Sequence, residues 1–230
     1  MSLPDKTTTI EAAVARIPDG ATIMVGGFGV PGTPFTLIRE LVRQGQKDLT
    51  LIKNDANETG MGIDLLIANG QVKTLISTHI GLNANAISAL NSGRIRVEFC
   101  AQGILAERIR AGGAGLSAIV TDIGLGTELA EGKQVVEMHG KRLLVESALR
   151  ADVALIHADR ADPFGNLTYA ATARNFNPLM AMAAPMVIAE VETLGPLGSL
   201  SPEAVETPGA FVDHVAELSE LSEDYGIVRR

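Results

Sequence analysis

The 230-residue sequence contains no tryptophan, only six phenylalanines and two tyrosines, and a single cysteine. So few aromatic side chains leave little surface on which unpaired nucleic-acid bases can stack. Positive charge is also scarce, because 19 Lys and Arg face 27 Asp and Glu, which gives a net charge of -8. No basic run exists that would neutralise a phosphate backbone. We therefore expect no nucleic-acid partner.

The single cysteine, Cys100, excludes an intrachain disulfide and is typical of a reducing compartment. It lies in an apolar run, where we expect a buried structural thiol. The longest apolar stretch, near 178–189, is short and contains two prolines, and residues 1–13 contain no apolar signal core. The sequence therefore predicts no membrane span and no secretion signal, and it favours a cytoplasmic location.

Apolar residues make up 46% of the chain and charged residues 20%, which is usual for a globular domain. Apolar runs rich in Val, Ile and Leu predict strands at 21–25, 49–52, 72–77, 95–101, 153–158 and 186–191. Between them, helical spacing of apolar residues predicts helices at 8–16, 35–44, 61–68, 84–91 and 105–110. Nearly continuous apolarity indicates strands covered on both faces. The pattern predicts one α/β domain over residues 1–230, with an open, mainly parallel sheet and helices on both faces.

Two segments depart from this alternation. Between Gln134 and Val145, the residues Met138 to Lys141 separate two short apolar segments, which predicts a small antiparallel hairpin excursion. The acidic residues 217–224 are expected to form a solvated terminal helix. No internal repeat or linker divides the sequence.

The densest chemical signal is the glycine-rich segment 26–32, which follows the first predicted strand. Glycines let the backbone turn sharply and present N–H groups at the carboxyl end of the strand, where open α/β sheets bind ligands. Residues 27–32 satisfy G-x-G-x-x-G, and Asp55 follows the second strand as a ribose-binding acid would. Pro34, however, would fall inside a helix that began within the motif. We therefore expect the helix to begin at Thr33–Pro34 after a wide loop, with a nicotinamide site or a purely structural turn as alternatives.

Residues 19–34 resemble the first signature of the family I coenzyme A transferases, which has an Asp-Gly opening, an apolar triplet, Gly-Gly-Phe, and then Gly and Pro in fixed spacing. The likeness continues along the chain. It is carried by residues 49–56, 101–115, 165–177 and 207–210. The sequence is most similar to the α subunits of acetate (acetoacetyl-CoA) and 3-oxoacid CoA-transferases.

The resemblance implies a mechanism shared between two chains. In that family a glutamate attacks the acyl-CoA carbonyl and carries CoA as a thioester, and a second carboxylate then takes it back in a ping-pong reaction. The nucleophile lies in a Ser-Glu-Asn-Gly motif of the β subunit, and this chain has no such motif. The resemblance thus implies no catalytic residue here, a β-subunit partner in an α2β2 or larger assembly, an acyl-CoA thioester and a free carboxylic acid as substrates, and no tightly bound cofactor.

The resemblance also implies binding residues. The loop is expected to bind CoA or the developing oxyanion through Gly26, Gly27, Phe28, Gly29, Val30, Pro31 and Gly32. Asn54 and Gln102 follow predicted strands and are candidates for binding a substrate carboxylate or carbonyl, with loop capping as the alternative. Asp55 is not expected to face an anionic substrate.

Other polar residues favour structural roles. Arg108 and Arg110 are candidates for pairing with CoA phosphate, but a solvated or subunit-facing helix that ends at Gly112–Gly113 is favoured. The segment 175–178 is typical of a loop, an N-cap and a proline at the first helical position. Residues 179–186 are candidates for the core or for a subunit interface. Four histidines lack metal-ligand spacing, so no metal site is predicted: His79, His139, His157 and His214.

Two other functions stay open at this point. One is a stand-alone ligand-binding or sensor domain for sugar phosphates, which fold analogy alone supports. The other is a nicotinamide-dependent oxidoreductase. Within the CoA-transferase interpretation, the sequence does not choose among acetate, butyrate, acetoacetate, succinate and longer dicarboxylates as the acid.

Overall fold

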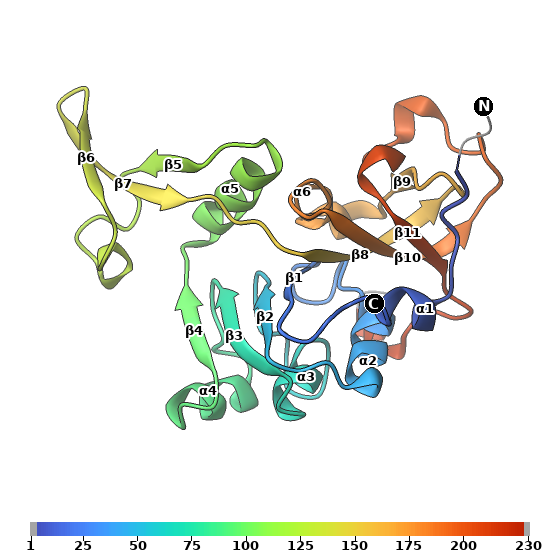
Figure 1. Cartoon of the computed structure of the whole chain (residues 1–230), viewed down its shortest axis with the longest axis horizontal. Helices are drawn as coiled ribbons and strands as arrows, with labels where there is room; N and C mark the ends of the chain where they lie inside the picture. The colour runs from blue at the N-terminus through green and yellow to red at the C-terminus, as the bar shows by residue number, and fades with distance from the viewer. Residues whose placement is uncertain (1–3, 228–230) are drawn as a thin grey trace.

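One parallel sheet crosses the middle of the molecule in the computed structural model, which describes residues 4–227 (Figure 1). Its strand order is β11-β10-β8-β1-β2-β3-β4, and each neighbouring pair is parallel. The strands are β1 (Thr22–Val25), β2 (Leu49–Ile52), β3 (Val72–Ser77), β4 (Arg96–Phe99), β8 (Val153–Ala161), β10 (Met186–Leu194) and β11 (His214–Glu217). A short strand, β9 (Leu167–Thr168), pairs antiparallel with β8. The predicted open, mainly parallel sheet is confirmed, whereas β9 and β11 were not expected.

Helices cover both faces of this sheet, as predicted. Ile23 and Val25 of β1 belong to one core cluster and Met24 to the other, because successive side chains of a strand point to opposite faces. The first cluster packs under α1 (Ile10–Val14), α2 (Phe35–Gln44), α3 (Asp64–Ala68) and α4 (Ala84–Asn91), and the second under α5 (Gln102–Gly113) and α6 (Asn177–Met182). Short 3-10 helices are η1 (Glu128–Ala130), η2 (Ala171–Arg174), η3 (Pro202–Ala204), η4 (Gly209–Phe211) and η5 (Glu223–Ile227).

A small antiparallel sheet projects from this body (Figure 1). Its strand order is β5-β7-β6, with β5 (Ala118–Thr121), β6 (Val135–Met138) and β7 (Lys141–Ser147). The predicted hairpin excursion is confirmed as β6 and β7, and β5 adds a strand that the pattern did not reveal. Arg108 fixes the base of this sheet, because its guanidinium donates to Glu98 Oε1 at 2.9 Å and to the Ser147 carbonyl at 2.8 Å.

Helix α5 ends at Gly113, as predicted, but the left-handed residue that follows it is Gly115, with φ +76°, rather than either of the two predicted glycines. A Cβ on Gly112 would collide with the Leu149 carbonyl, and one on Gly113 would lie 2.8 Å from Met182 Cβ. These glycines therefore allow α5 to pack closely against the segment between β7 and β8 and against α6.

We expect Gly112→Ala to lower the free energy of unfolding by about 1–3 kcal/mol, because the added methyl group meets backbone atoms that cannot yield easily. The measurement is urea unfolding followed by circular dichroism. Gly103→Ala is the matched control in the same helix, since a Cβ there meets nothing within 4 Å. It should leave stability unchanged or raise it by up to about 1 kcal/mol. Equal midpoints for the two variants would contradict the packing argument.

The prediction of a solvated terminal helix at 217–224 was wrong. Glu217 ends β11, and the chain then runs to η5, where the buried Tyr225 lies edge-on to Phe35 at 4.9 Å between ring centroids. The Tyr225 hydroxyl donates to the Thr33 carbonyl. The acidic composition of the tail concealed this one aromatic anchor, which attaches the tail to the start of α2.

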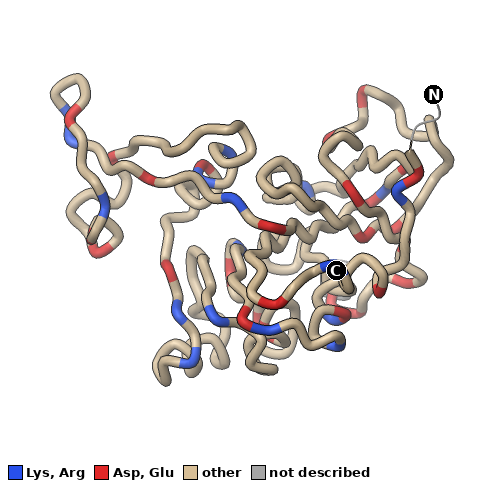
Figure 2. The backbone as a smooth tube through the Cα atoms, viewed as in Figure 1, with Lys and Arg blue, Asp and Glu red and all other residues tan. Residues whose placement is uncertain are grey.

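Charges are distributed over the whole chain, with Lys and Arg interspersed among Asp and Glu (Figure 2). Within residues 4–227, no helix has the length and apolar character needed to cross a membrane.

Candidate functional site

The glycine loop, residues 26–32, joins the carboxyl end of β1 to α2. Gly26 N–H continues the sheet pairing by donating to the Leu155 carbonyl at 2.9 Å. Gly27, Gly29 and Gly32 have φ of +97°, +60° and +75°, which side chains of L-residues rarely adopt. Helix α2 begins at Phe35, outside the glycine motif, as the position of Pro34 predicted. The loop is therefore wide, unlike the tight turn of a dinucleotide fingerprint.

Asp55, at the carboxyl end of β2, holds the loop from one side. Its Oδ2 accepts the Gly29 N–H at 2.8 Å, and its Oδ1 accepts the Asn57 N–H at 2.8 Å. Asn57 Nδ2 in turn donates to the Gly29 carbonyl at 2.8 Å. Both polar groups of the Gly29 backbone are thus bound by the segment after β2, which fixes the loop conformation.

Lys53 lies next to Asp55 and supplies a positive charge to this hydrogen-bond network. Its side chain is fully buried, and Nζ lies 3.8 Å from Asp55 Oδ2, with no hydrogen-bond partner among the described residues. Burial lowers the pKa of Lys53, and the Asp55 charge only partly offsets this. Burial raises the pKa of Asp55, but the Lys53 charge and three N–H donors outweigh it and hold that pKa below its ordinary value. Asp55 is therefore an ionised structural carboxylate, in keeping with its exclusion as a substrate ligand.

The structure brings the two predicted amides together. Gln102, the first residue of α5, donates from Nε2 to Asn54 Oδ1 at 2.8 Å, and Asn54 Nδ2 donates to Asp55 Oδ2 at 3.0 Å. Asn54 is fully buried, whereas Gln102 is exposed. Of the pair, Gln102 is therefore the amide that faces solvent at the carboxyl ends of the strands, and Asn54 orients it.

A second group of side chains holds the loop from the other side. Asn175 Nδ2 donates to the Pro31 carbonyl at 2.9 Å, and Asn177 Nδ2 donates to the Gly32 carbonyl at 3.1 Å. The predicted loop, N-cap and proline are present but shifted by one residue, because Phe176 is the N-cap residue, Asn177 is the first residue of α6 and Pro178 is the second rather than the first. The asparagines serve the glycine loop because their amides reach its carbonyls across the fold.

Beneath the same loop lies a buried histidine between two carboxylates. His157 Nδ1 lies 3.0 Å from Glu190 Oε1, and Nε2 lies 3.3 Å from Glu192 Oε1. Burial lowers the pKa of His157, but the two glutamates outweigh it and raise that pKa to about 9. Glu190 also accepts the Leu37 N–H at 2.8 Å in the first turn of α2, where an anion is favourable. Sequence reasoning missed this cluster because its members are far apart along the chain.

A small pocket opens beside the loop at the carboxyl ends of β1, β2 and β3. It has a volume of about 150 Å³. Its lining is mostly apolar, with two acidic residues, an asparagine and a histidine, namely Phe28, Gly29, Val30, Asp55, Ala56, Asn57, Glu58, Met61, His79, Ile80 and Leu82. In open α/β sheets this edge is where ligands bind. Phe28 is 47% exposed although it is apolar, so its ring is available to a ligand.

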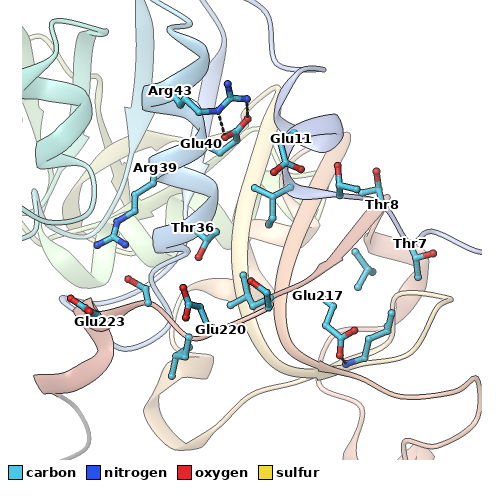
Figure 3. Close-up of a pocket in the computed structure, with 18 residues that line it drawn as sticks. Thr7, Thr8, Glu11, Thr36, Arg39, Glu40, Arg43, Glu217, Glu220 and Glu223 are labelled. Atoms are coloured by element: carbon cyan, nitrogen blue, oxygen red, sulfur yellow. Dashed lines mark hydrogen bonds and ion pairs between the residues drawn. The ribbon is translucent and has the colours of Figure 1, made fainter.

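A larger hollow of about 800 Å³ lies elsewhere, between α1, α2 and the segment after β11 (Figure 3). Five glutamates line it: Glu11, Glu40, Glu217, Glu220 and Glu223. Its two arginines are already paired, Arg43 with Glu40 at 2.6 Å and Arg39 with Asp224 at 2.9 Å. The glycine loop is nevertheless taken as the candidate site, because its backbone turns sharply and presents N–H groups at the carboxyl end of β1, where open α/β sheets bind ligands.

The remaining predicted residues lie apart from the loop. Arg108 is buried in its ion pair with Glu98, and Arg110 is paired with Glu107 at 2.8 Å on the surface of α5. The side chains of residues 179–186 lie partly in the core and partly at the surface: Met180 is fully buried, whereas Met182 is 42% exposed. Within the part of the chain that the structure describes, no three His, Cys, Asp or Glu side chains are grouped as a metal site would require.

The fold is an open α/β sheet, and its candidate ligand site is the glycine loop at the carboxyl edge of the parallel strands. The model of the coenzyme A transferase family matches residues 7–218. The chain belongs to this family, and it is a CoA-transferase chain of the alpha type. The sensor and nicotinamide alternatives are accordingly set aside.

Curated relatives agree with this assignment. The chain is 51% identical to the alpha subunit of a probable coenzyme A transferase of Bacillus subtilis strain 168, over 91% of this chain and 92% of the relative. It is 47% identical to the alpha subunit of the acetate CoA-transferase of Escherichia coli K12, over 94% and 98%. It is 41% identical to the corresponding subunit of a succinyl-CoA:3-ketoacid coenzyme A transferase of Helicobacter pylori strain J99, over 90% of each chain.

Among solved structures, the chain resembles an acyl-CoA transferase of Escherichia coli O157:H7, crystallised as a thioester complex with CoA. The TM-score is 0.84 at 25% sequence identity. The match covers 96% of this chain but 48% of the other, so this chain spans about half the length of that protein.

Proposed function

We propose that this α chain moves CoA between a short-chain acyl-CoA or 3-oxoacyl-CoA and a free carboxylate, together with a separate β subunit. The observation that carries the proposal is the match, over nearly the whole chain, to relatives that are each named as one subunit of a CoA-transferase. The solved acyl-CoA transferase is about twice as long as this chain, which supports a second half supplied by a partner. An α2β2 or larger even assembly suits closed symmetry.

The proposed reaction is ping-pong and passes through a glutamyl-CoA thioester on the β subunit. In the first half-reaction the glutamate breaks the acyl-CoA thioester and forms an acyl-glutamyl anhydride, and the released CoA thiolate then attacks the glutamyl carbonyl, which gives glutamyl-CoA and frees the first acid. The second half-reaction runs the same steps in reverse with the acceptor carboxylate. This chain contains no Ser-Glu-Asn-Gly motif. The thioester complex of the related acyl-CoA transferase supports a covalent intermediate of this kind.

In this proposal the glycine loop, Gly26–Gly32, forms the CoA-binding wall of the site. Three of its amides are already engaged, because Gly26 N–H donates to Leu155, Phe28 N–H donates to the Pro31 carbonyl at 3.1 Å and Gly29 N–H donates to Asp55. The N–H groups of Gly27, Val30 and Gly32 have no acceptor among the described residues, and that of Gly27, the nearest of the three to the end of β1, is the proposed oxyanion donor. An aligned donor of this type contributes about 2.7–4 kcal/mol to transition-state stabilisation. Gln102, oriented by Asn54, is the proposed amide for the substrate carbonyl or carboxylate.

The test is co-expression with a β chain that carries Ser-Glu-Asn-Gly, followed by an assay of CoA exchange between acids. The isolated α chain should be at least about 1,000-fold slower than the complex, because the nucleophile is absent. After incubation with acyl-CoA, borohydride should reduce the thioester, and mass spectrometry should locate the modified glutamate on the β chain. A modified carboxylate on this chain, such as the exposed Glu58, would overturn the division of roles.

A further inference from the structure

The pocket beside the glycine loop has a largely apolar lining. Apolar side chains from three different segments line it: Phe28 and Val30 from the loop, Met61, and Ile80 and Leu82 after β3. Leu82 is 69% exposed and Phe28 is 47% exposed, so apolar surface is presented to whatever enters. Burial of that surface favours an apolar ligand group.

The charged residues of this pocket are acidic. Asp55 and Glu58 line it, and among its described lining residues there is no Lys or Arg. The nearby Lys53 is fully buried and is the counter-charge of Asp55, so it offers no cation to a ligand, and Glu58 is the acidic residue of the lining that has no ion-pair partner among the described residues. His79 is exposed at the edge, and its Nδ1 lies 3.1 Å from Thr78 Oγ1. A carboxylate on a substrate would therefore enter next to like charges without a matching cation.

The volume of this pocket limits the size of the acyl chain that it can hold. A protein cavity of roughly 150 Å³ lined by apolar residues is known to hold one benzene molecule, which has about six heavy atoms. The pocket beside the loop has about the same volume. An acyl chain of up to about six carbons is consistent with that space.

We infer that this pocket receives the acyl chain of a short monocarboxylic acid, with an uncharged far end, and rejects dicarboxylic acids. The inference rests on the proposed function and names its substrate class. It distinguishes between the substrates in the names of the relatives, which include acetate, and also succinyl-CoA and 3-oxoadipate. Glu58, Phe28 and Leu82 are the residues that determine specificity.

The experiment measures kcat/KM of the α–β complex for butanoate and for succinate, with acetyl-CoA as the CoA donor. Wild-type enzyme should prefer butanoate by at least about 100-fold, since the second carboxylate of succinate would leave water for an apolar and acidic pocket that offers no counter-charge. Glu58→Gln should reduce this preference, and Glu58→Arg should reduce it further, to about 10-fold or less, because the new cation pairs with the second carboxylate of succinate. Glu58 is exposed, so both substitutions are compatible with folding.

Glu203→Arg is the matched control, because Glu203 is exposed in η3 and does not line the pocket. It should leave the butanoate-to-succinate ratio unchanged. Equal use of both acids by the wild-type complex, or a ratio that is the same in Glu58→Arg and wild type, would overturn the inference while the proposed function stood. Absence of exchange with every acid would overturn the proposed function, and the inference with it.

Discussion

Asp55→Asn is expected to lower the free energy of unfolding by about 3–5 kcal/mol, because it leaves the Lys53 ammonium buried without its counter-charge. Lys53 is fully buried and Asp55 is 6% exposed, so water cannot replace the lost partner. The asparagine oxygen can still accept the Gly29 N–H, but its NH2 group then faces the Asn57 N–H, so the variant loses a hydrogen bond as well as the charge. Urea unfolding at pH 7 measures the loss.

The double variant Lys53→Met/Asp55→Asn tests this explanation. Removing both charges should restore most of the stability, since replacing a buried ion pair by apolar groups is often neutral or stabilising. Asp122→Asn serves as the control on an exposed aspartate, and it should change stability by less than about 0.5 kcal/mol. If the double variant is as unstable as Asp55→Asn alone, hydrogen bonds rather than charge explain the role of Asp55.

The depressed pKa of Asp55 also gives this stabilisation a pH dependence. The contribution is present above the ordinary aspartate pKa of 3.8 and is lost as the pH falls through the lower pKa of the folded state. The loop should therefore remain attached to Asp55 at neutral pH, and the Gly29 amide should exchange slowly with deuterated solvent.

The wild-type chain is expected to lose about 3 kcal/mol of stability between pH 6.5 and pH 9 through His157 alone. The folded-state pKa of His157 is about 9, raised from 6.5, so the stabilisation is complete below pH 6.5 and disappears as the pH rises through 9. The physical cause is the position of the protonated ring between Glu190 and Glu192. Guanidinium unfolding at pH 6, 7.5 and 9 measures the change.

His157→Gln removes the titrating group, so its stability curve should lack this decline over the same pH interval. His139→Asn is the matched control, because His139 is exposed in the turn of the β6–β7 hairpin and has φ +53°, a conformation that Asn tolerates. The control should follow the wild-type curve. If the difference in free energy of unfolding between wild type and His157→Gln stays constant from pH 6.5 to 9, His157 is neutral in the folded protein over that interval.

The predicted strands and helices illustrate how local pattern specifies this fold. Segments 49–52 and 72–77 are observed as β2 and β3, and 35–44 and 84–91 as α2 and α4, with the predicted bounds. Each of these segments has a continuous apolar run or a helical periodicity that only one structure satisfies. In contrast, β11 was missed because His214 to Glu217 is too short and too polar to stand out, and its pairing with β10 compensates for that.

The sequence by itself determined the parallel sheet, the position of the glycine loop after β1, and the family, because all three depend on residues that are close together in the chain. The tertiary structure decided what holds the loop: Asp55 and Asn57 from one side, and Asn175 and Asn177 from the other. It also decided that Glu58 and Leu82 share one pocket with Phe28. These contacts join residues separated by tens to more than a hundred positions, and only the strand order of the sheet brings them together. Spacing along a chain carries no information about such distances, which is why the acidic character of the pocket could not be predicted.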